Sequence, residues 1–203
     1  MIIKVCGMRD PKNIADVEEL GVDLMGFIFY SKSPRFVAHK PTYMPVMAKR
    51  VGVFVNEEIR KVVRIAKNYS LDYLQLHGSE SVEYCEELQA LGYSLIKAFT
   101  VSSTEDILKA TAYEHCCEMF IFDTKCSCVG GSGVSFDWSL LEEYSGKVPF
   151  LLSGGLGLDN IESIKSFKHE KLIGYDLNSA FEIVAAVKSI SKLDVFINDI
   201  KDI

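Results

Sequence analysis

Residues 119–123 read Met-Phe-Ile-Phe-Asp, four consecutive apolar residues that end in a carboxylate. A continuous apolar run of this length is typical of a parallel strand that is buried on both faces. Residues 150–155 read Phe-Leu-Leu-Ser-Gly-Gly and repeat the layout, with a hydroxyl and two glycines at the end. Both stretches predict a buried strand whose carboxyl end carries polar or flexible groups.

Runs of the same kind recur along the chain and alternate with segments of helical periodicity. Val17 and Leu20 are spaced as on one face of a helix and precede Gly21, a typical C-terminal stop. The sequence predicts strands at 2–6, 23–29, 51–55, 73–76, 94–98, 119–122, 150–152 and 172–176. It predicts helices at 13–20, 58–69, 81–91, 104–113, 138–144 and 160–167.

Eight strand–helix units in one chain indicate an α/β fold, a (β/α)8 TIM barrel closed by right-handed crossovers. A doubly wound open sheet is the competing architecture. The chain has 203 residues, and the barrel fold needs at least about 200. No linker, low-complexity block or charge run divides it, so we expect one barrel domain of near-minimal length over residues 1–203.

The charge balance narrows the class of partner. Lys and Arg total 22 and Asp and Glu total 28, a formal net charge of −6. Nucleic acid and anionic membranes attract clustered basic charge, so we expect neither as a partner. No run approaches the ~18 apolar residues of a membrane span, and the first residues lack the layout of a signal peptide. We expect a cytoplasmic protein, a monomer or a homodimer, that binds a small molecule.

The cysteines do not form a recognisable metal motif. Cys116 and Cys117 are adjacent, and the spacer between Cys126 and Cys128 is shorter than in a zinc knuckle. Free thiols are the expected state in a reducing compartment. We therefore do not expect a structural zinc site.

The candidate functional residues stand at predicted strand ends, where barrel active sites form. Cys6 ends the first strand and could be a small buried residue, a nucleophile, a metal ligand or a general base. Asp123 ends the sixth and could start a loop or act as a general acid. Arg35 follows the second strand and could be solvated or could bind a carboxylate or phosphate. His77 could orient a substrate or contact a loop carbonyl.

Two glycine clusters point to an anion. One contains Gly131 within 130–133, and the other is Gly154-Gly155 after the seventh strand. Either could be a flexible loop. However, a glycine loop after the seventh strand, with a short helix beginning near Asn178 and Ser179 after the eighth, matches the usual phosphate site of such barrels. The sequence therefore predicts a phosphorylated substrate.

Several of these segments, in order, resemble the phosphoribosylanthranilate isomerase family. The matching strings are Lys4-Val5-Cys6-Gly7-Met8-Arg9, Gly26-Phe27-Ile28-Phe29 with Ser33-Pro34-Arg35, Val51-Gly52-Val53-Phe54-Val55, Leu74-Gln75-Leu76-His77-Gly78, the segment 130–138, and Leu152-Ser153-Gly154-Gly155-Leu156. The match covers nearly the whole chain.

The resemblance implies a cofactor-free Amadori rearrangement in tryptophan biosynthesis. N-(5-phosphoribosyl)anthranilate becomes 1-(2-carboxyphenylamino)-1-deoxyribulose 5-phosphate. By resemblance, Asp123 is the general acid that protonates the ring oxygen, and Cys6 as thiolate is the general base that removes the C2′ proton. The residues expected to bind substrate are Arg35 (to the carboxylate), Gln75, His77, Gly131, Gly154, Gly155, Asp176, Asn178 and Ser179.

The chain departs from the family pattern after the eighth strand. Ala180 replaces a usual glycine, and Val184-Ala185-Ala186 replaces a usual Pro-Gly. These changes bear on which backbone N–H groups reach the phosphate. One rival is an aminoimidazole-carboxamide ribotide isomerase, which uses aspartates at both catalytic positions, unlike Cys6 here. Another is a non-catalytic phosphosugar-binding barrel, which the presence of both Cys6 and Asp123 disfavours.

Overall fold

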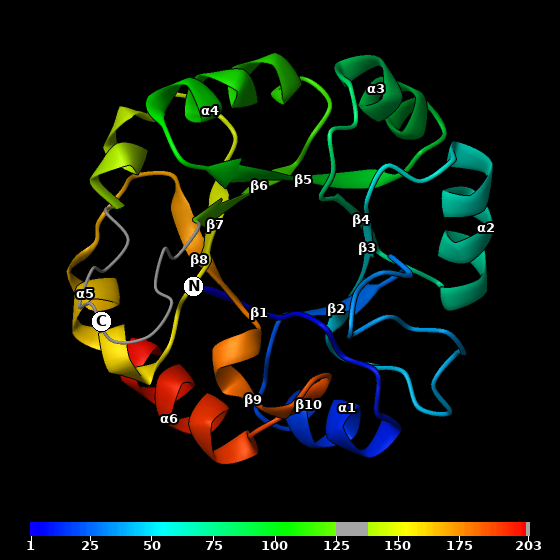
Figure 1. Cartoon of the computed structure of the whole chain (residues 1–203), viewed down its shortest axis with the longest axis vertical. Coiled ribbons are helices and arrows are strands. Elements are labelled where there is room, and N and C mark those ends of the chain that lie inside the picture. Colours follow the sequence, from blue (N-terminus) through cyan, green and yellow to red (C-terminus); the bar gives the residue numbers. More distant parts are fainter. Residues whose placement is uncertain (125–137, 202–203) are drawn as a thin grey trace.

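The structure is a computed structural model that describes residues 1–124 and 138–201. In it, parallel strands close into a single barrel in chain order, with β8 returning to pair with β1. The strands are β1 Ile2–Val5, β2 Leu24–Ile28, β3 Lys49–Phe54, β4 Tyr73–Leu76, β5 Ser94–Val101, β6 Met119–Thr124, β7 Phe150–Ser153 and β8 Leu172–Leu177. Figure 1 shows the ring of strands with helices outside it. The predicted TIM barrel is confirmed, and closure between β1 and β8 excludes the open sheet.

Six α-helices lie within the described residues, and their ends follow local sequence signals. They are α1 Pro11–Glu18, α2 Ile59–Tyr69, α3 Val82–Ala90, α4 Thr104–Leu108, α5 Ile161–Ser166 and α6 Ile190–Lys201. The Asp10 carboxylate accepts a hydrogen bond from the Asn13 N–H and caps α1, which has Pro11 in its first turn. The Ser81 hydroxyl caps α3 in the same way.

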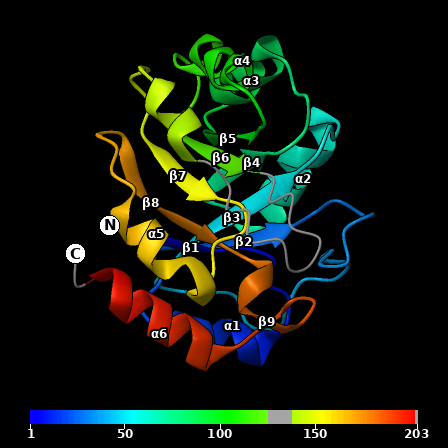
Figure 2. The same ribbon diagram turned by 60° about the vertical axis from the view of Figure 1, so that its left-hand side comes forward.

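The connection between β2 and β3 does not contain the helix that eight full strand–helix units require. Residues 29–48 run through turns and bends, and Figure 2 shows this connection projecting from the side of the barrel. Pro34, Pro41 and Pro45 fall within it, and each removes a backbone donor and disfavours helix in the preceding residue. The helices predicted from the sequence also leave this connection without one, so the barrel closes with an irregular second unit.

Two predicted helices are tighter or shorter than expected. Residues Trp138–Glu143 form a 3₁₀ segment. The helix predicted at 104–113 divides into α4 and a 3₁₀ segment at Lys109–Tyr113. There the Thr111 hydroxyl donates to the Leu108 carbonyl at 2.8 Å, a side-chain bond that competes with regular helix. After β8, a 3₁₀ turn at Ser179–Phe181 leads into a hairpin of β9 Glu182–Val184 and β10 Val187–Lys188, which was not predicted.

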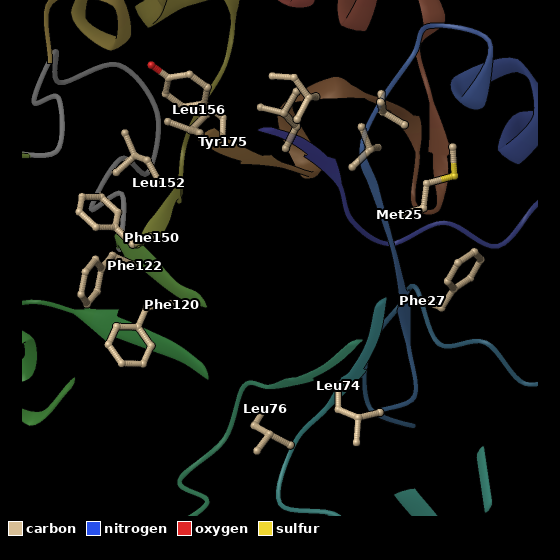
Figure 3. Packing of buried hydrophobic residues seen from close by; sticks show 14 of the residues in the cluster. Met25, Phe27, Leu74, Leu76, Phe120, Phe122, Phe150, Leu152, Leu156 and Tyr175 are labelled. Atoms are coloured by element: carbon tan, nitrogen blue, oxygen red, sulfur yellow. The ribbon is translucent and has the colours of Figure 1, made fainter. Parts of the chain in front are cut away.

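Alternation along the strands separates the outer core from the barrel interior. Figure 3 shows residues of the outer layer, among them Phe27, Leu74, Phe122 and Phe150. Met119 and Ile121 on β6 belong instead to the inner cluster. Because side chains two residues apart share a face of a strand, Asp123 continues this inward series. The Asp123 side chain therefore lies on the inner face of β6, at the mouth of the barrel.

Candidate active site

A cavity of about 280 Å³ opens at the carboxyl ends of the strands. Its lining includes every residue predicted to act on or bind the substrate, except Arg35 and Gly131. Gly131 lies outside the described residues. The residues brought together are Cys6, Gln75, His77, Asp123, Gly154, Gly155, Asp176, Asn178 and Ser179. The cavity thus unites a thiol, carboxyls, an imidazole and glycine-rich backbone.

Cys6 lies directly after β1 and is only 4% exposed. Its N–H donates to the Leu177 carbonyl of β8 at 2.8 Å, which fixes the start of the loop. A Cβ at Gly26 of the neighbouring strand would lie 2.7 Å from the Cys6 Sγ. The absence of a side chain at Gly26 is therefore what makes room for the thiol.

A buried ion pair neighbours this thiol. The Lys4 Nζ lies 2.8 Å from Asp176 Oδ1, and the Lys4 side chain is fully buried. Burial disfavours the ammonium of Lys4, but the negative charge of Asp176 and the neighbouring Cys6 sulfur outweigh it and hold the pKa of Lys4 above its ordinary value. Lys4 is therefore a fixed cation beside the reactive groups.

The thiol responds to the same charges. Burial raises the pKa of Cys6 above its ordinary value, and Asp176 adds to the rise, while Lys4 and Lys188 oppose it. The balance favours the thiol over the thiolate in the free protein. The expected thiolate base thus has to form against a desolvation penalty, with two lysines reducing that penalty.

Gln75, His77 and Asp123 form a short polar chain across the mouth. The Gln75 Nε2 lies 3.1 Å from His77 Nδ1, and His77 Nε2 lies 3.3 Å from Asp123 Oδ2. An amide nitrogen can only donate, so His77 Nδ1 accepts and the imidazole presents an N–H to Asp123. Gln75 is fully buried, and its Oε1 has no hydrogen-bond partner among the described residues. It is an acceptor available to a bound molecule.

Arg35 does not line the cavity, but its side chain passes Gly7 close to Asn178, which does line it. A Cβ at Gly7, whose φ is +79°, would lie 2.6 Å from Arg35 Cδ, so Gly7 allows the arginine to pass close to the backbone. The guanidinium is paired with Glu182, with Nε 2.8 Å from Oε1 and Nη2 2.5 Å from Oε2. Hydrogen bonding to Glu182 raises the pKa of Arg35. The Arg35 guanidinium, which we predicted to bind the substrate carboxylate, is therefore already paired with the carboxylate of Glu182 on β9.

The glycines after β7 have the conformations that an anion loop uses. Gly154 has φ +88° and Gly155 has φ +63°, which L-residues with side chains rarely adopt. On the facing turn, Ala180 is not among the described residues with positive φ, so the missing family glycine causes no strain there. Ala186, in the other altered segment, does have φ +67°. The departure that strains the backbone is therefore the one in the hairpin.

Three charged residues of this region were not identified from the sequence. They are Lys4, Glu182 and Lys188, whose Nζ lies 2.7 Å from both Glu182 Oε1 and Asn178 Oδ1. Lys4 could have been found, because a lysine facing inward within the predicted first strand must pair with a buried anion. Glu182 and Lys188 carried no comparable signal.

Together these features define a (β/α)8-barrel enzyme equipped for acid–base chemistry on a small anionic molecule. Residues 3–199 match the model of the family described as N-(5'phosphoribosyl)anthranilate (PRA) isomerase. The chain belongs to this family.

Individual relatives are similar over most of their length. The N-(5'-phosphoribosyl)anthranilate isomerase of Parabacteroides distasonis is 51% identical over 206 residues, which cover 98% of this chain and 93% of that protein. The enzyme of the same name from Phocaeicola vulgatus is 47% identical, with 99% and 98% covered.

Solved structures agree with this assignment. The phosphoribosyl anthranilate isomerase of Thermotoga maritima superposes with a TM-score of 0.84 at 32% identity, with both chains fully covered. A phosphoribosyl anthranilate isomerase in complex with reduced 1-(o-carboxyphenylamino)-1-deoxyribulose 5-phosphate gives a TM-score of 0.84 at 30% identity, also with both chains fully covered.

Proposed function

We propose that this protein isomerises N-(5'-phosphoribosyl)anthranilate to 1-(2-carboxyphenylamino)-1-deoxyribulose 5-phosphate, as part of tryptophan biosynthesis. The observation that carries the proposal is that Cys6 and Asp123 line one cavity in a member of this isomerase family. One ionisable group that donates a proton and one that removes a proton are what an Amadori rearrangement needs.

In the proposed mechanism, Asp123 protonates the ring oxygen of the ribose. The C1′–O bond then breaks, and the nitrogen lone pair forms an iminium ion at C1′. His77, within hydrogen-bond reach of Asp123, positions the carboxyl group. Gln75 Oε1 accepts a hydrogen bond from a sugar hydroxyl, which satisfies its unpaired acceptor.

Cys6 then removes the C2′ proton, and the electrons of that C–H bond neutralise the iminium to give an enolamine that tautomerises to the ketone. Burial raises the pKa of the Cys6 thiol in the free protein. A positive iminium beside the sulfur favours the thiolate, as do Lys4 and Lys188. We infer that the base becomes strong enough when ring opening places this cation in the cavity.

Two anionic ends of the substrate have separate binding groups. The substrate carboxylate contacts the guanidinium of Arg35. Glu182 fixes the orientation of this guanidinium through Nε and Nη2, and Nη1 makes no hydrogen bond to a described residue. The phosphate binds between the Gly154–Gly155 loop and the turn at Asn178 and Ser179, mainly through backbone N–H groups.

The location we propose for this reaction is the cytoplasm. The described cysteines at 6, 85, 116 and 117 are free thiols, the state that a reducing compartment maintains. Separately, none of the helices in the described part of the chain is long and apolar enough to cross a membrane.

The test is to incubate the protein with freshly prepared phosphoribosylanthranilate and follow the loss of its fluorescence together with formation of the ketose. We expect loss that depends on enzyme concentration and that slows by about 10²-fold or more in the Cys6→Ser and Asp123→Asn variants. Binding of the substrate without turnover would instead indicate a phosphosugar-binding barrel. Turnover retained in both variants would place the chemistry on other residues.

A further inference from the structure

Three thiols that take no part in the proposed reaction meet on the outer side of the barrel. Cys85 lies on α3, and Cys116 and Cys117 lie in the turn that leads into β6. Their Sγ atoms all lie within 4.8 Å of one another, and those of Cys116 and Cys117 are 3.9 Å apart. All three residues are buried within the outer core, whereas Cys6 belongs to a separate cluster at the barrel mouth.

The backbone turn produces this convergence. Adjacent residues of an extended chain point to opposite sides, so neighbouring cysteines usually separate their sulfurs. Here the N–H groups of Cys116 and Cys117 both donate to the Tyr113 carbonyl, at 3.2 and 3.1 Å. The resulting turn directs both thiols toward Cys85, which α3 supplies from 31 positions earlier in the chain. The spacing of the cysteines along the sequence could not reveal this triad.

The triad has the dimensions of a three-coordinate metal site. With metal–sulfur bonds of about 2.3 Å, three sulfurs around one ion in a plane stand about 4 Å apart. The Cys116–Cys117 edge of 3.9 Å already has this length, and the other edges need only a small closure. Structural zinc usually takes four ligands, whereas monovalent copper is a soft ion that thiolates select and that accepts three sulfurs.

We propose that Cys85, Cys116 and Cys117 form a binding site for Cu(I) with three sulfur ligands. Each Cu–S bond to a thiolate releases one thiol proton to solvent and leaves the oxidation state of both atoms unchanged. The buried Lys97 and Glu80 are paired with each other 3.2 Å apart, so that pair supplies no net charge to neutralise thiolates. A bound Cu(I) ion would cancel one of the three thiolate charges. The bound ion would also link α3 to the start of β6.

The experiment uses the full chain in which Cys126 and Cys128, outside the described residues, are replaced by serine, so that their thiols do not compete. Under anaerobic conditions this protein is titrated with Cu(I) in the presence of the chromophoric chelator bicinchoninate. We expect it to take one equivalent of copper from the chelator. Loss of an outer-shell partner alone weakens metal sites by about 10–100-fold, so Cys85→Ala should weaken binding by at least about 100-fold. Cys6→Ser is the matched control and should leave copper affinity unchanged.

Two measurements do not depend on the folding of a core variant. X-ray absorption of the copper-loaded parent should show a shell of three sulfurs, and its thermal midpoint should rise with Cu(I), because the ion binds the folded state. A shell of two sulfurs overturns the proposal. Failure of the parent to compete with the chelator does so as well, as does a folded Cys85→Ala variant that binds copper like the parent.

Discussion

The Lys4 Nζ lies 2.8 Å from Asp176 Oδ1, and both side chains are buried. Lys4 stands on β1 two residues before Cys6, and Asp176 is the residue that pairs with Lys4 on β8. The pair places a fixed cation and a fixed anion beside the proposed base. Lys4 lowers the pKa of Cys6 and Asp176 raises it, on top of the larger rise from burial. The pH dependence of the enzyme therefore reports on this pair.

Replacing Lys4 by methionine should shift the rising limb of the activity profile to higher pH. The thiolate is the active form, so kcat/KM rises with pH toward the pKa of Cys6. Removal of the Lys4 cation raises that pKa further, and each unit lowers the thiolate fraction about tenfold at a fixed pH below it. We expect at least a tenfold loss at pH 7.5 that is partly recovered at higher pH.

The control for this prediction is Lys12→Met, because Lys12 pairs with Asp16 on the exposed surface of α1. Its profile should equal that of the parent. If the Lys4→Met profile keeps the shape and midpoint of the parent, Lys4 does not act on the base. Stability must be measured alongside, since Asp176 is left as an uncompensated buried charge that typically costs about 3–5 kcal/mol.

Cys6→Ser should fold normally and lose about 10²-fold or more in kcat. Serine fits the space that Gly26 leaves, but an alcohol is far more basic than a thiol and is scarcely ionised near neutral pH. Circular dichroism and single-turnover kinetics measure the two effects. Near-parental turnover would remove Cys6 from the role of base.

Gly26→Ala tests whether the position of the thiol matters as well as its presence. The new Cβ would lie 2.7 Å from Cys6 Sγ and 3.1 Å from Cys6 Cα, so the sulfur must shift. We expect at least about a tenfold loss in kcat, since misplacement by about 1 Å can cost 10²-fold.

The control for this prediction is Gly21→Ala, which separates an effect on stability from an effect on activity. A Cβ at Gly21 meets nothing within 4 Å, but the φ of +72° is strained for alanine. That variant should lose about 1 kcal/mol of stability and no activity.

Arg35→Ala should weaken binding of product analogues that carry the carboxylate. The guanidinium side chain is 19% exposed, and a hydrogen bond to a charged group contributes about 2 kcal/mol, or roughly thirtyfold in affinity. An analogue without the carboxylate should bind the parent and the variant alike. Equal losses for both analogues would show that Arg35 acts through Glu182 to hold the hairpin.

The sequence allowed prediction of those parts of the site that depend on local pattern. Cys6 and Asp123 could be placed because each ends a buried strand, and the ends of parallel strands meet at one mouth. Pairings across the chain could not be predicted. Arg35 and Glu182 are 147 positions apart, and Lys4 and Asp176 are 172 apart, so neither pair leaves a periodic signal. The hairpin that carries Glu182 and Lys188 requires a left-handed alanine at 186, which residue type alone does not suggest.

The phosphate subsite gives the last prediction. Gly154, at φ +88°, lines the cavity opposite the turn that begins at Asn178 and Ser179. A β-branched side chain at this φ is strained and would project where the phosphate oxygens approach the backbone, so Gly154→Val should abolish inhibition by inorganic phosphate.

The turn after β8 is a 3₁₀ segment of three residues, so its dipole adds little and the individual N–H groups must do the binding. Because those contacts come from the backbone, Ser179→Ala should weaken phosphate inhibition no more than about threefold, within the value of one neutral hydrogen bond. Phosphate inhibition constants of the parent and both variants, with circular dichroism to confirm folding, decide the matter. If a folded Gly154→Val variant is inhibited like the parent, the phosphate binds elsewhere; if Ser179→Ala loses inhibition entirely, its hydroxyl and not the backbone holds the anion.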